Sequence, residues 1–265
     1  MTKSQPLKWH GGKSYLAKWI ISNFPSRDIY THYNEAFAGG LSVLFAHDPT
    51  NKSESVNDLN KELTNFWNVL REYPATFYNY LELTPLSQID WEAVKENTDS
   101  NIWRAVRFFI KYRQSRQGLG KDYATPTTRT RRGMNENVSA WLSAIDGLRE
   151  AHERLIRVEI RNMPAIEFIK QYDHPKALFY LDPPYLHSTR SSRNEYECEM
   201  TEFDHLELLN TLYTIEGKFI LSGYDNELYN FWYKPKFRRV QIEIDNKASS
   251  AKIKETKVEC LWMNY

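Results

Sequence analysis

Short apolar runs alternate with amphipathic stretches along most of the chain, which has 265 residues. Apolar runs of about four to eight residues predict buried strands, and apolar residues spaced about three or four apart predict helices. Seven strands are predicted, at residues 30–35, 55–58, 157–161, 177–181, 218–222, 238–244 and 256–262. Helices are predicted to follow most of them, at residues 41–47, 60–72, 164–171, 204–212 and 226–232. Because this alternation is typical of parallel sheets covered by helices, we expect an α/β fold, with the last two strands antiparallel.

The alternation of strands and helices stops between residues 73 and 156. Helical patterns replace it, at residues 102–112 and 138–155, and they flank a stretch at 114–134 that is rich in Gly, Thr and Arg. We therefore predict a sheet domain made of residues 1–72 and 157–265. A mostly helical insertion, residues 73–156, is predicted to interrupt it.

Positive charge is concentrated in this insertion. The net charge of the whole chain is only +1, but residues 101–134 contain nine basic residues and only one acidic residue, Asp122, and so carry +8. By difference (+1 − 8), the rest of the chain carries −7. A basic block in an otherwise mildly acidic protein predicts a local surface for a polyanion such as nucleic acid.

Other global features exclude several classes of protein. Cys198 and Cys260 form no CxxC pair, so neither a disulfide framework nor a structural zinc site is expected. No apolar run approaches the roughly 20 residues of a membrane span, and the amino terminus does not resemble a signal peptide. We therefore expect a cytoplasmic protein without a metal site.

The sharpest chemical motif is Asp182-Pro183-Pro184-Tyr185, which follows the apolar strand at 177–181. Residues of these types suit chemistry on the exocyclic amine of a base. This amine is a poor nucleophile because its lone pair is delocalised into the ring. A carboxylate and a backbone carbonyl that accept its two N–H groups favour a pyramidal nitrogen with a free lone pair. The prolines hold the turn in one shape, and the tyrosine offers a ring on which an extruded base stacks. The motif therefore predicts a catalytic turn, with a capped turn at the end of a strand as the alternative.

Two motifs earlier in the chain predict an adenosine site. Gly39 and Gly40 follow the first strand, where glycine lets the backbone approach a ligand. Asp58 follows the next strand, about twenty residues on, where a carboxylate is able to hold the hydroxyls of a ribose. Taken singly, the two motifs also fit an ordinary turn and a helix cap at Asp58 or Asn60.

A third motif, Lys8-Trp9-His10-Gly11-Gly12-Lys13, lies near the amino terminus. A phosphate-binding P-loop is disfavoured, because the position that requires its first glycine is Leu7. Trp9 is suited to wall an adenine or methionine pocket, and Lys13 is suited to reach a carboxylate. A surface turn with a half-buried tryptophan is the alternative.

The order of these motifs resembles that of the Dam-type DNA adenine methyltransferases, in particular the short forms carried by phages and prophages. The likeness runs from Lys-Trp-His-Gly-Gly-Lys through Phe-Ala-Gly-Gly and Asn-Asp to Asp-Pro-Pro-Tyr and covers nearly the whole chain. It implies a Rossmann-like sheet that binds S-adenosylmethionine, with a DNA-recognition insertion. The residues implied to bind this cofactor are Trp9, Lys13, Phe37, Gly39, Gly40, Asp58 and Asp182, and those implied to hold the target amine are Asp182, Pro183, Pro184 and Tyr185.

The sequence departs from that family in two places. The glycine motif usually reads Phe-x-Gly-x-Gly, but its last position here is Leu41. Residues 114–134 do not match the recognition hairpin of the members that read GATC, so the resemblance does not extend to that specificity.

We therefore expect site-specific N6 methylation of adenine in double-stranded DNA by base flipping. DNA contacts are predicted for Arg113, Arg116, Lys121, Arg129, Arg131, Arg132, Arg190 and Arg193. Specificity is expected within residues 114–134, where further candidates for base contacts are Gln114, Gln117, Thr127 and Thr128. The alternatives are the same chemistry on cytosine N4 or on RNA adenine, and a DNA-binding module whose catalytic site has decayed.

Overall fold

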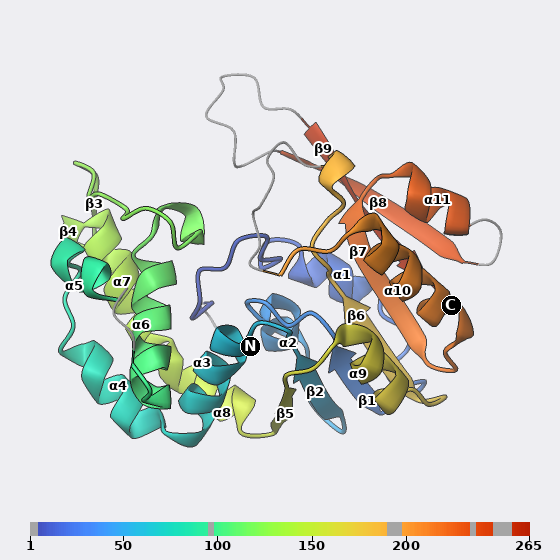
Figure 1. Ribbon diagram of the computed structural model, residues 1–265, viewed down its shortest axis with the longest axis horizontal. Helices are drawn as coiled ribbons and strands as arrows, with labels where there is room; N and C mark the ends of the chain where they lie inside the picture. The colour runs from blue at the N-terminus through green and yellow to red at the C-terminus, as the bar shows by residue number, and fades with distance from the viewer. Residues whose placement is uncertain (1–4, 95–97, 190–197, 234–236, 246–255) are drawn as a thin grey trace. The chain divides into compact units, whose positions relative to one another are not determined.

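The computed structural model describes residues 5–94, 98–189, 198–233, 237–245 and 256–265 (Figure 1). Its main feature is a seven-stranded sheet with the strand order β5-β2-β1-β6-β7-β9-β8. The strands are β1 (His32–Glu35), β2 (Ser53–Asn57), β5 (Val158–Arg161), β6 (Ala177–Leu181), β7 (Lys218–Tyr224), β8 (Arg238–Asp245) and β9 (Thr256–Met263). All seven predicted strands are confirmed, with small shifts at their ends.

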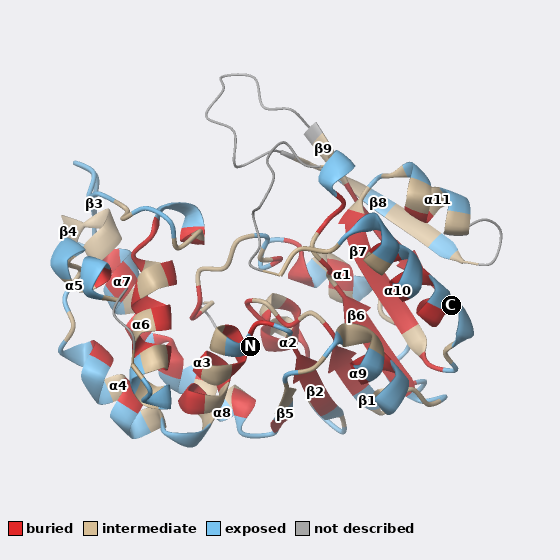
Figure 2. Cartoon of the chain, viewed as in Figure 1, coloured by how far each residue is buried: buried red, intermediate tan, exposed pale blue. Residues whose placement is uncertain are grey.

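The strand directions confirm the predicted α/β class. β1 pairs in parallel with β2 and with β6, and β6 pairs in parallel with β7. β9 then runs antiparallel between β7 and β8, as predicted for the last two strands. All five residues of β6 are buried, as expected for a parallel strand covered on both faces (Figure 2). The carboxyl ends of β2, β1, β6 and β7 therefore lie at one edge of the sheet.

The chain forms two compact units. The first comprises Met1–Ser22, Ala38–Thr50 and Asn60–Asn162, and the second comprises Asn23–Phe37, Asn51–Leu59 and Met163–Tyr265. We call the first the helical unit and the second the sheet unit.

In the sheet unit, three helices cover one face of the strands (Figure 1). They are α9 (Ala165–Tyr172), α10 (Glu202–Thr214) and α11 (Glu227–Tyr233). Phe179 of β6, Phe219 of β7 and Trp262 of β9 contribute to the apolar core on this face. Because side chains alternate along a strand, the residues between them point to the opposite face. Ser222 and Tyr224 of β7 lie there, together with Glu259, which is the register partner of Tyr224.

The helical unit is built around aromatic side chains. Phe66 and Trp67 are fully buried and lie 4.5 Å apart between ring centroids, and Phe66 stacks on Phe109 at 5.9 Å. The helices are α1 (Ala17–Ser22), α2 (Ser42–Ala46), α3 (Lys61–Glu72), α4 (Pro74–Glu82), α5 (Gln88–Ala93), α6 (Asn101–Arg113), α7 (Glu136–Asp146) and α8 (Leu148–Leu155). The described part of residues 73–156 is mostly helical, as predicted.

Three details of the helical unit differ from the prediction. The helical pattern at 138–155 is divided into α7 and α8 at Gly147, a residue of low helix propensity. The short helix α1 was not predicted. A two-stranded hairpin, β3 (Thr130–Arg131) and β4 (Met134–Asn135), was not predicted either. None of the helices in the described residues is long and apolar enough to cross a membrane.

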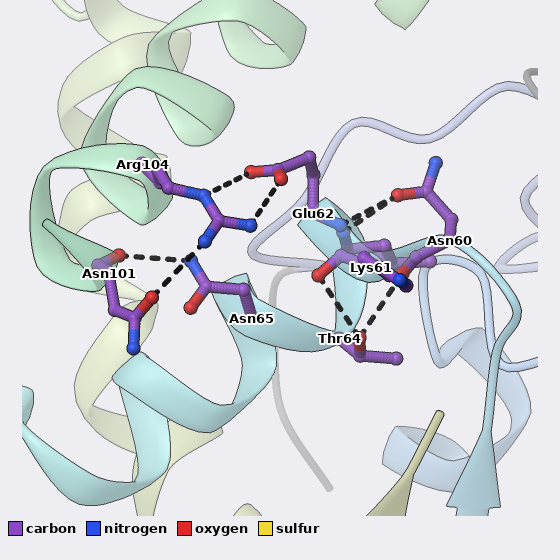
Figure 3. A network of polar contacts seen from close by, with 8 residues as sticks. Asn60, Lys61, Glu62, Thr64, Asn65, Asn101 and Arg104 are labelled. Carbon is purple, nitrogen blue, oxygen red and sulfur yellow. Dashed lines mark hydrogen bonds and ion pairs between the residues drawn. The ribbon is translucent and has the colours of Figure 1, made fainter. Parts of the chain in front are cut away.

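Polar contacts at the start of α3 fix this helix and join it to α6 (Figure 3). The Asn60 side chain accepts hydrogen bonds from the backbone N–H groups of Glu62 and Leu63, each at 3.0 Å, and so caps the helix. Glu62 then forms a two-pronged ion pair with Arg104 of α6. The cap that sequence analysis left open between Asp58 and Asn60 is therefore Asn60.

Candidate active site

The Asp182-Pro183-Pro184-Tyr185 turn begins where β6 ends. β6 is a central strand, and its buried apolar residues hold the start of the turn in the interior of the sheet unit. Asp182 is half-buried at the carboxyl edge of the sheet. Tyr185 is only 8% exposed. A half-buried carboxylate beside a rigid Pro-Pro backbone has the hydrogen-bond acceptors that an amino group requires.

Both the hydroxyl and the ring of Tyr185 are held by neighbouring side chains. Its hydroxyl donates a hydrogen bond to the carboxylate of Glu259 and lies 3.4 Å from Oγ of Ser222. Its ring meets Tyr224 edge to face, with the ring centroids 4.6 Å apart. Burial raises the pKa of Tyr185 well above its ordinary value, and the charges of Asp182 and Glu259 raise this pKa further. The hydroxyl therefore stays protonated and remains a donor.

The end of β2 carries a structural residue and a candidate ligand-binding residue side by side. The Asn57 amide donates to the backbone oxygens of Ala36 (3.1 Å) and Met163 (3.0 Å) and accepts from Met163 N–H (3.0 Å). It therefore ties the ends of β1 and β2 to the segment before α9. Asp58, the next residue, is half-buried and follows the strand directly. Since Asn60 caps α3, the alternative explanation of Asp58 as a helix cap is removed.

In the helical unit, Trp9 packs closely on the glycine motif. A side-chain carbon at Gly39 would lie 3.1 Å from the Trp9 indole, and Gly39 has a positive φ of 48°. Both observations favour glycine at this position. The Gly39 carbonyl accepts a hydrogen bond from Trp67 Nε1 at 3.1 Å. The other side of Trp9 faces α6, with the ring of Tyr112 4.9 Å away. Trp9 is half-buried.

Leu41, where the family usually has glycine, adopts the left-handed conformation with φ 54° and ψ 31°. This conformation costs an L residue about 1–2 kcal/mol, which explains why glycine suits the position. Leu41 is fully buried, and burial of a leucine contributes about 1.5–3 kcal/mol. Burial therefore offsets the strain, and the turn is formed without the third glycine.

The three other predicted cofactor residues, Lys13, Phe37 and Gly40, are all at least half-buried. Lys13 is 6% exposed, and one of its hydrogen bonds goes to the Gly11 carbonyl at 3.0 Å. Phe37 packs against the apolar core of the sheet unit. In the part of the chain that the structure describes, no cluster of three or more His, Cys, Asp or Glu residues is arranged to hold a metal ion.

Near the end of the basic segment, residues 101–134, the chain forms the β3–β4 hairpin. The turn of this hairpin is Arg132-Gly133. Both residues have a positive φ (56° and 74°), as a two-residue type I′ turn requires. The Arg132 side chain folds back onto α7, where its Nε donates to Ser139 Oγ at 2.9 Å and its Nη2 donates to Ser143 Oγ at 2.7 Å. Arg132 thus braces the hairpin against its own unit.

The first turn of α7 holds the segment that leads into the hairpin. The Asn135 amide donates to the Thr127 carbonyl at 2.6 Å, and the Asn137 amide donates to the Ala124 carbonyl at 3.1 Å. The Thr127 hydroxyl donates to Glu136 at 2.7 Å. Thr127, a candidate for base contacts in the sequence analysis, is therefore used to anchor the loop.

Two further residues of the basic segment are largely internal. Burial lowers the pKa of Arg113 to about 10, and its guanidinium donates to the Ala140 carbonyl at 3.1 Å. Gln114 is 1% exposed, and its amide bonds to the backbone of Ser87 (3.2 Å) and Pro85 (3.1 Å). The suggestion that Gln114 contacts a base is therefore wrong, because its side chain is buried and already paired.

Four further residues that are predicted to contact DNA lie on the surface. Arg116, Lys121, Arg129 and Arg131 are exposed. Among the residues that the structure describes, no hydrogen-bond or ion-pair partner contacts the side chains of Arg116, Arg129 or Arg131. Arg190 and Arg193 fall outside the described residues.

Sequence analysis missed Glu259. The only signal was its position as an acidic residue within the apolar run of the last strand. Its partner could not be found from sequence, because Tyr185 lies 74 residues away in the chain.

A mostly parallel seven-stranded sheet with an antiparallel end, and with an Asp-Pro-Pro-Tyr turn at the carboxyl end of a central strand, defines a Rossmann-like methyltransferase that uses S-adenosylmethionine. Comparison with known families gives the group within this class. The D12 class of N6 adenine-specific DNA methyltransferases matches residues 9–247. The chain belongs to this family and is an S-adenosylmethionine-dependent DNA adenine methyltransferase. A search among curated proteins found no significant match.

Proposed function

We propose that this methyltransferase acts on double-stranded DNA and that the Asp182–Tyr185 turn receives an adenine flipped out of the duplex. The observation that carries the proposal is the position of the turn at the carboxyl end of β6. Asp58 follows β2, which is separated from β6 only by β1, so the two carboxylates lie at the same edge of the sheet. In open α/β sheets, ligands bind at this edge.

In this proposal the residues of the turn prepare the adenine amine for attack. Asp182 and the Pro183 carbonyl accept its two N–H groups, which favours a pyramidal nitrogen with its lone pair free. The interaction strengthens as the nitrogen pyramidalises, so it contributes mainly to the transition state. Tyr185 supplies an aromatic ring on which the flipped base stacks.

The residues that would hold the cofactor fit its chemistry. S-adenosylmethionine supplies an activated methyl group on a sulfonium. Asp58 is suited to the two ribose hydroxyls, since it is half-buried and is not the cap of α3. Trp9, Lys13, Phe37, Gly39 and Gly40 are proposed as further contacts, each from its place in the motifs that the family shares.

We further propose that residues 73–156 form the target-recognition region and that its exposed cations contact DNA. Arg116, Lys121, Arg129 and Arg131 are exposed and suited to phosphates or base edges. Arg113 and Arg132 are assigned a bracing role instead, because their guanidinium groups are already bonded within the protein. Because the substrate is DNA of a bacterial or phage-infected cell, we place the activity in the cytoplasm.

The test is methylation of an unmethylated DNA duplex with methyl-labelled S-adenosylmethionine, followed by digestion to nucleosides and mass analysis. The expected product is N6-methyldeoxyadenosine, formed on duplex DNA and not on RNA. Asp182→Ala is the control for contaminating activity. Methylation of cytosine, or methylation of RNA in preference to the duplex, would overturn the proposal.

A further inference from the structure

Glu259 is a buried acid beside the catalytic turn, on the face of the sheet opposite α9, α10 and α11. It lies on β9 opposite Tyr224 of β7 and is 1% exposed. One carboxylate oxygen, Oε1, accepts hydrogen bonds from both Tyr185 and Ser222, the latter at 2.7 Å. These two donors come from the catalytic turn and from the neighbouring strand.

The surroundings of Glu259 are unusual for a residue that only stabilises the fold. Burial of a carboxylate is costly, and well-packed apolar residues usually serve as well or better for stability. Within the described residues, no lysine, arginine or histidine contacts this carboxylate. Its two partners are neutral hydroxyl groups, and these are the groups that the buried carboxylate orients.

The main group that it orients is Tyr185. The phenol has one hydroxyl, and Glu259 fixes the direction of this hydroxyl, while Tyr224 fixes the ring plane. Together they restrain the hydroxyl and the ring of Tyr185. Tyr185 closes the turn that starts at Asp182, so a displaced ring would also release the backbone that carries the Pro183 carbonyl.

We propose that Glu259 is a positioning residue for methyl transfer, which holds Tyr185 and thereby the Asp182–Tyr185 turn in the geometry that receives the adenine. This inference rests on the proposed role of the turn. It assigns to β9, a strand outside the recognised motifs, a function in the chemical step.

Single-turnover methylation of a DNA duplex by three variants tests the assignment. Glu259→Ala and Tyr185→Phe each remove the same hydrogen bond and should lower the rate about 10- to 100-fold, the range expected for a hydrogen bond to a charged group. The double variant should be no slower than the slower single variant, because the two residues act as one unit. Glu259→Gln retains an acceptor oxygen and should recover part of the rate. The affinity for S-adenosylmethionine should stay within about twofold of wild type.

A second measurement separates positioning from general stability. With 2-aminopurine at the target position, Glu259→Ala should change the fluorescence of the flipped base, which reports how the base is stacked. Tyr33→Phe is the matched control: it removes a hydrogen bond of 2.7 Å between a buried tyrosine and a buried glutamate, Glu35, in the same sheet. It should lower stability by a similar amount but keep the single-turnover rate within about twofold of wild type.

The outcomes separate this inference from the function on which it rests. If the wild-type protein forms N6-methyldeoxyadenosine while Glu259→Ala and Tyr185→Phe keep its rate, the positioning role is refuted and the function stands. An equal loss of rate in Tyr33→Phe also overturns the inference, because the effect would then follow stability. If the wild-type protein methylates no adenine, the proposed function fails, and the role of Glu259 fails with it.

Discussion

The Asp182–Tyr185 turn and the β3–β4 hairpin both carry residues that are proposed to contact DNA, but they are held in opposite ways. At the turn, the Tyr185 side chain is buried and bonded inside the protein. In the hairpin, the backbone is anchored by the start of α7, while Arg129 and Arg131 are exposed. Under the proposed roles, the chemical step would depend on groups fixed by the interior of the protein. Selection of DNA would depend instead on side chains exposed at the surface.

The largest effect is expected from Asp182, the residue with which the catalytic turn begins. Asp182→Ala should reduce the single-turnover rate by about 100-fold or more, because it removes an acceptor whose bond to the amine tightens in the transition state. Rapid-quench assays give this rate, and thermal unfolding checks that the variant is folded. A near-normal rate in a folded variant would refute the assignment.

The hairpin side of the comparison is tested by alanine at three neighbouring arginines. At Arg129 or Arg131, loss of a base contact should cost about 1–3 kcal/mol of DNA affinity and relax one position of the target sequence. If the contact is to a phosphate, affinity should fall for all sequences and the salt slope should decrease by about 1.

Arg132→Ala is the matched variant, since this arginine is bonded to Ser139 and Ser143. It should lower the free energy of unfolding by roughly 1 kcal/mol. Salt-dependent binding gives the DNA affinity and the salt slope, and denaturant unfolding gives the free energy of unfolding. Base-modification sequencing gives the methylation pattern. If Arg129→Ala and Arg131→Ala leave affinity, salt slope and methylation pattern unchanged, the exposed arginines do not contact DNA.

A smaller effect is expected at the end of β2, where a binding residue and a structural residue are two positions apart. Asp58→Ala should weaken S-adenosylmethionine binding about tenfold, because it removes charge-assisted hydrogen bonds to the ribose. Asn60→Ala should instead lower the free energy of unfolding by about 1 kcal/mol through loss of the α3 cap, with cofactor affinity retained. Calorimetry and denaturant unfolding distinguish the two. Equal behaviour of both variants would contradict this division of roles.

The smallest effect is expected for the Glu62–Arg104 ion pair of Figure 3. The side chains are 44% and 33% exposed, so solvent screens their attraction. Arg104→Ala should change the free energy of unfolding by less than about 1 kcal/mol, measured by denaturant titration. A much larger loss would mean that this exposed ion pair stabilises the protein more than screening by solvent allows.

Much of the sheet was predictable because several of its strands are apolar runs, as the uninterrupted run of β6 illustrates. The position of the Asp182–Tyr185 turn was predictable because Asp-Pro-Pro-Tyr is contiguous and follows an apolar run. The hairpin was missed, because a two-residue strand such as Thr130–Arg131 has no periodicity and its turn uses Arg132 in a conformation that arginine rarely adopts. The burial of Gln114 was also missed, because its partners, Pro85 and Ser87, are set by tertiary packing.

The anchoring of the hairpin separates the residues that hold it from those that project from it. Asn135 and Asn137 bind backbone carbonyls, which every amino acid provides, and so they place no demand on the identity of the side chains in the loop. Positions 129 and 131 are therefore open to exchange without a change of scaffold. If the hairpin reads the target as proposed, a library randomised at these two sites, with 135–137 kept, would yield enzymes that mark new DNA sequences.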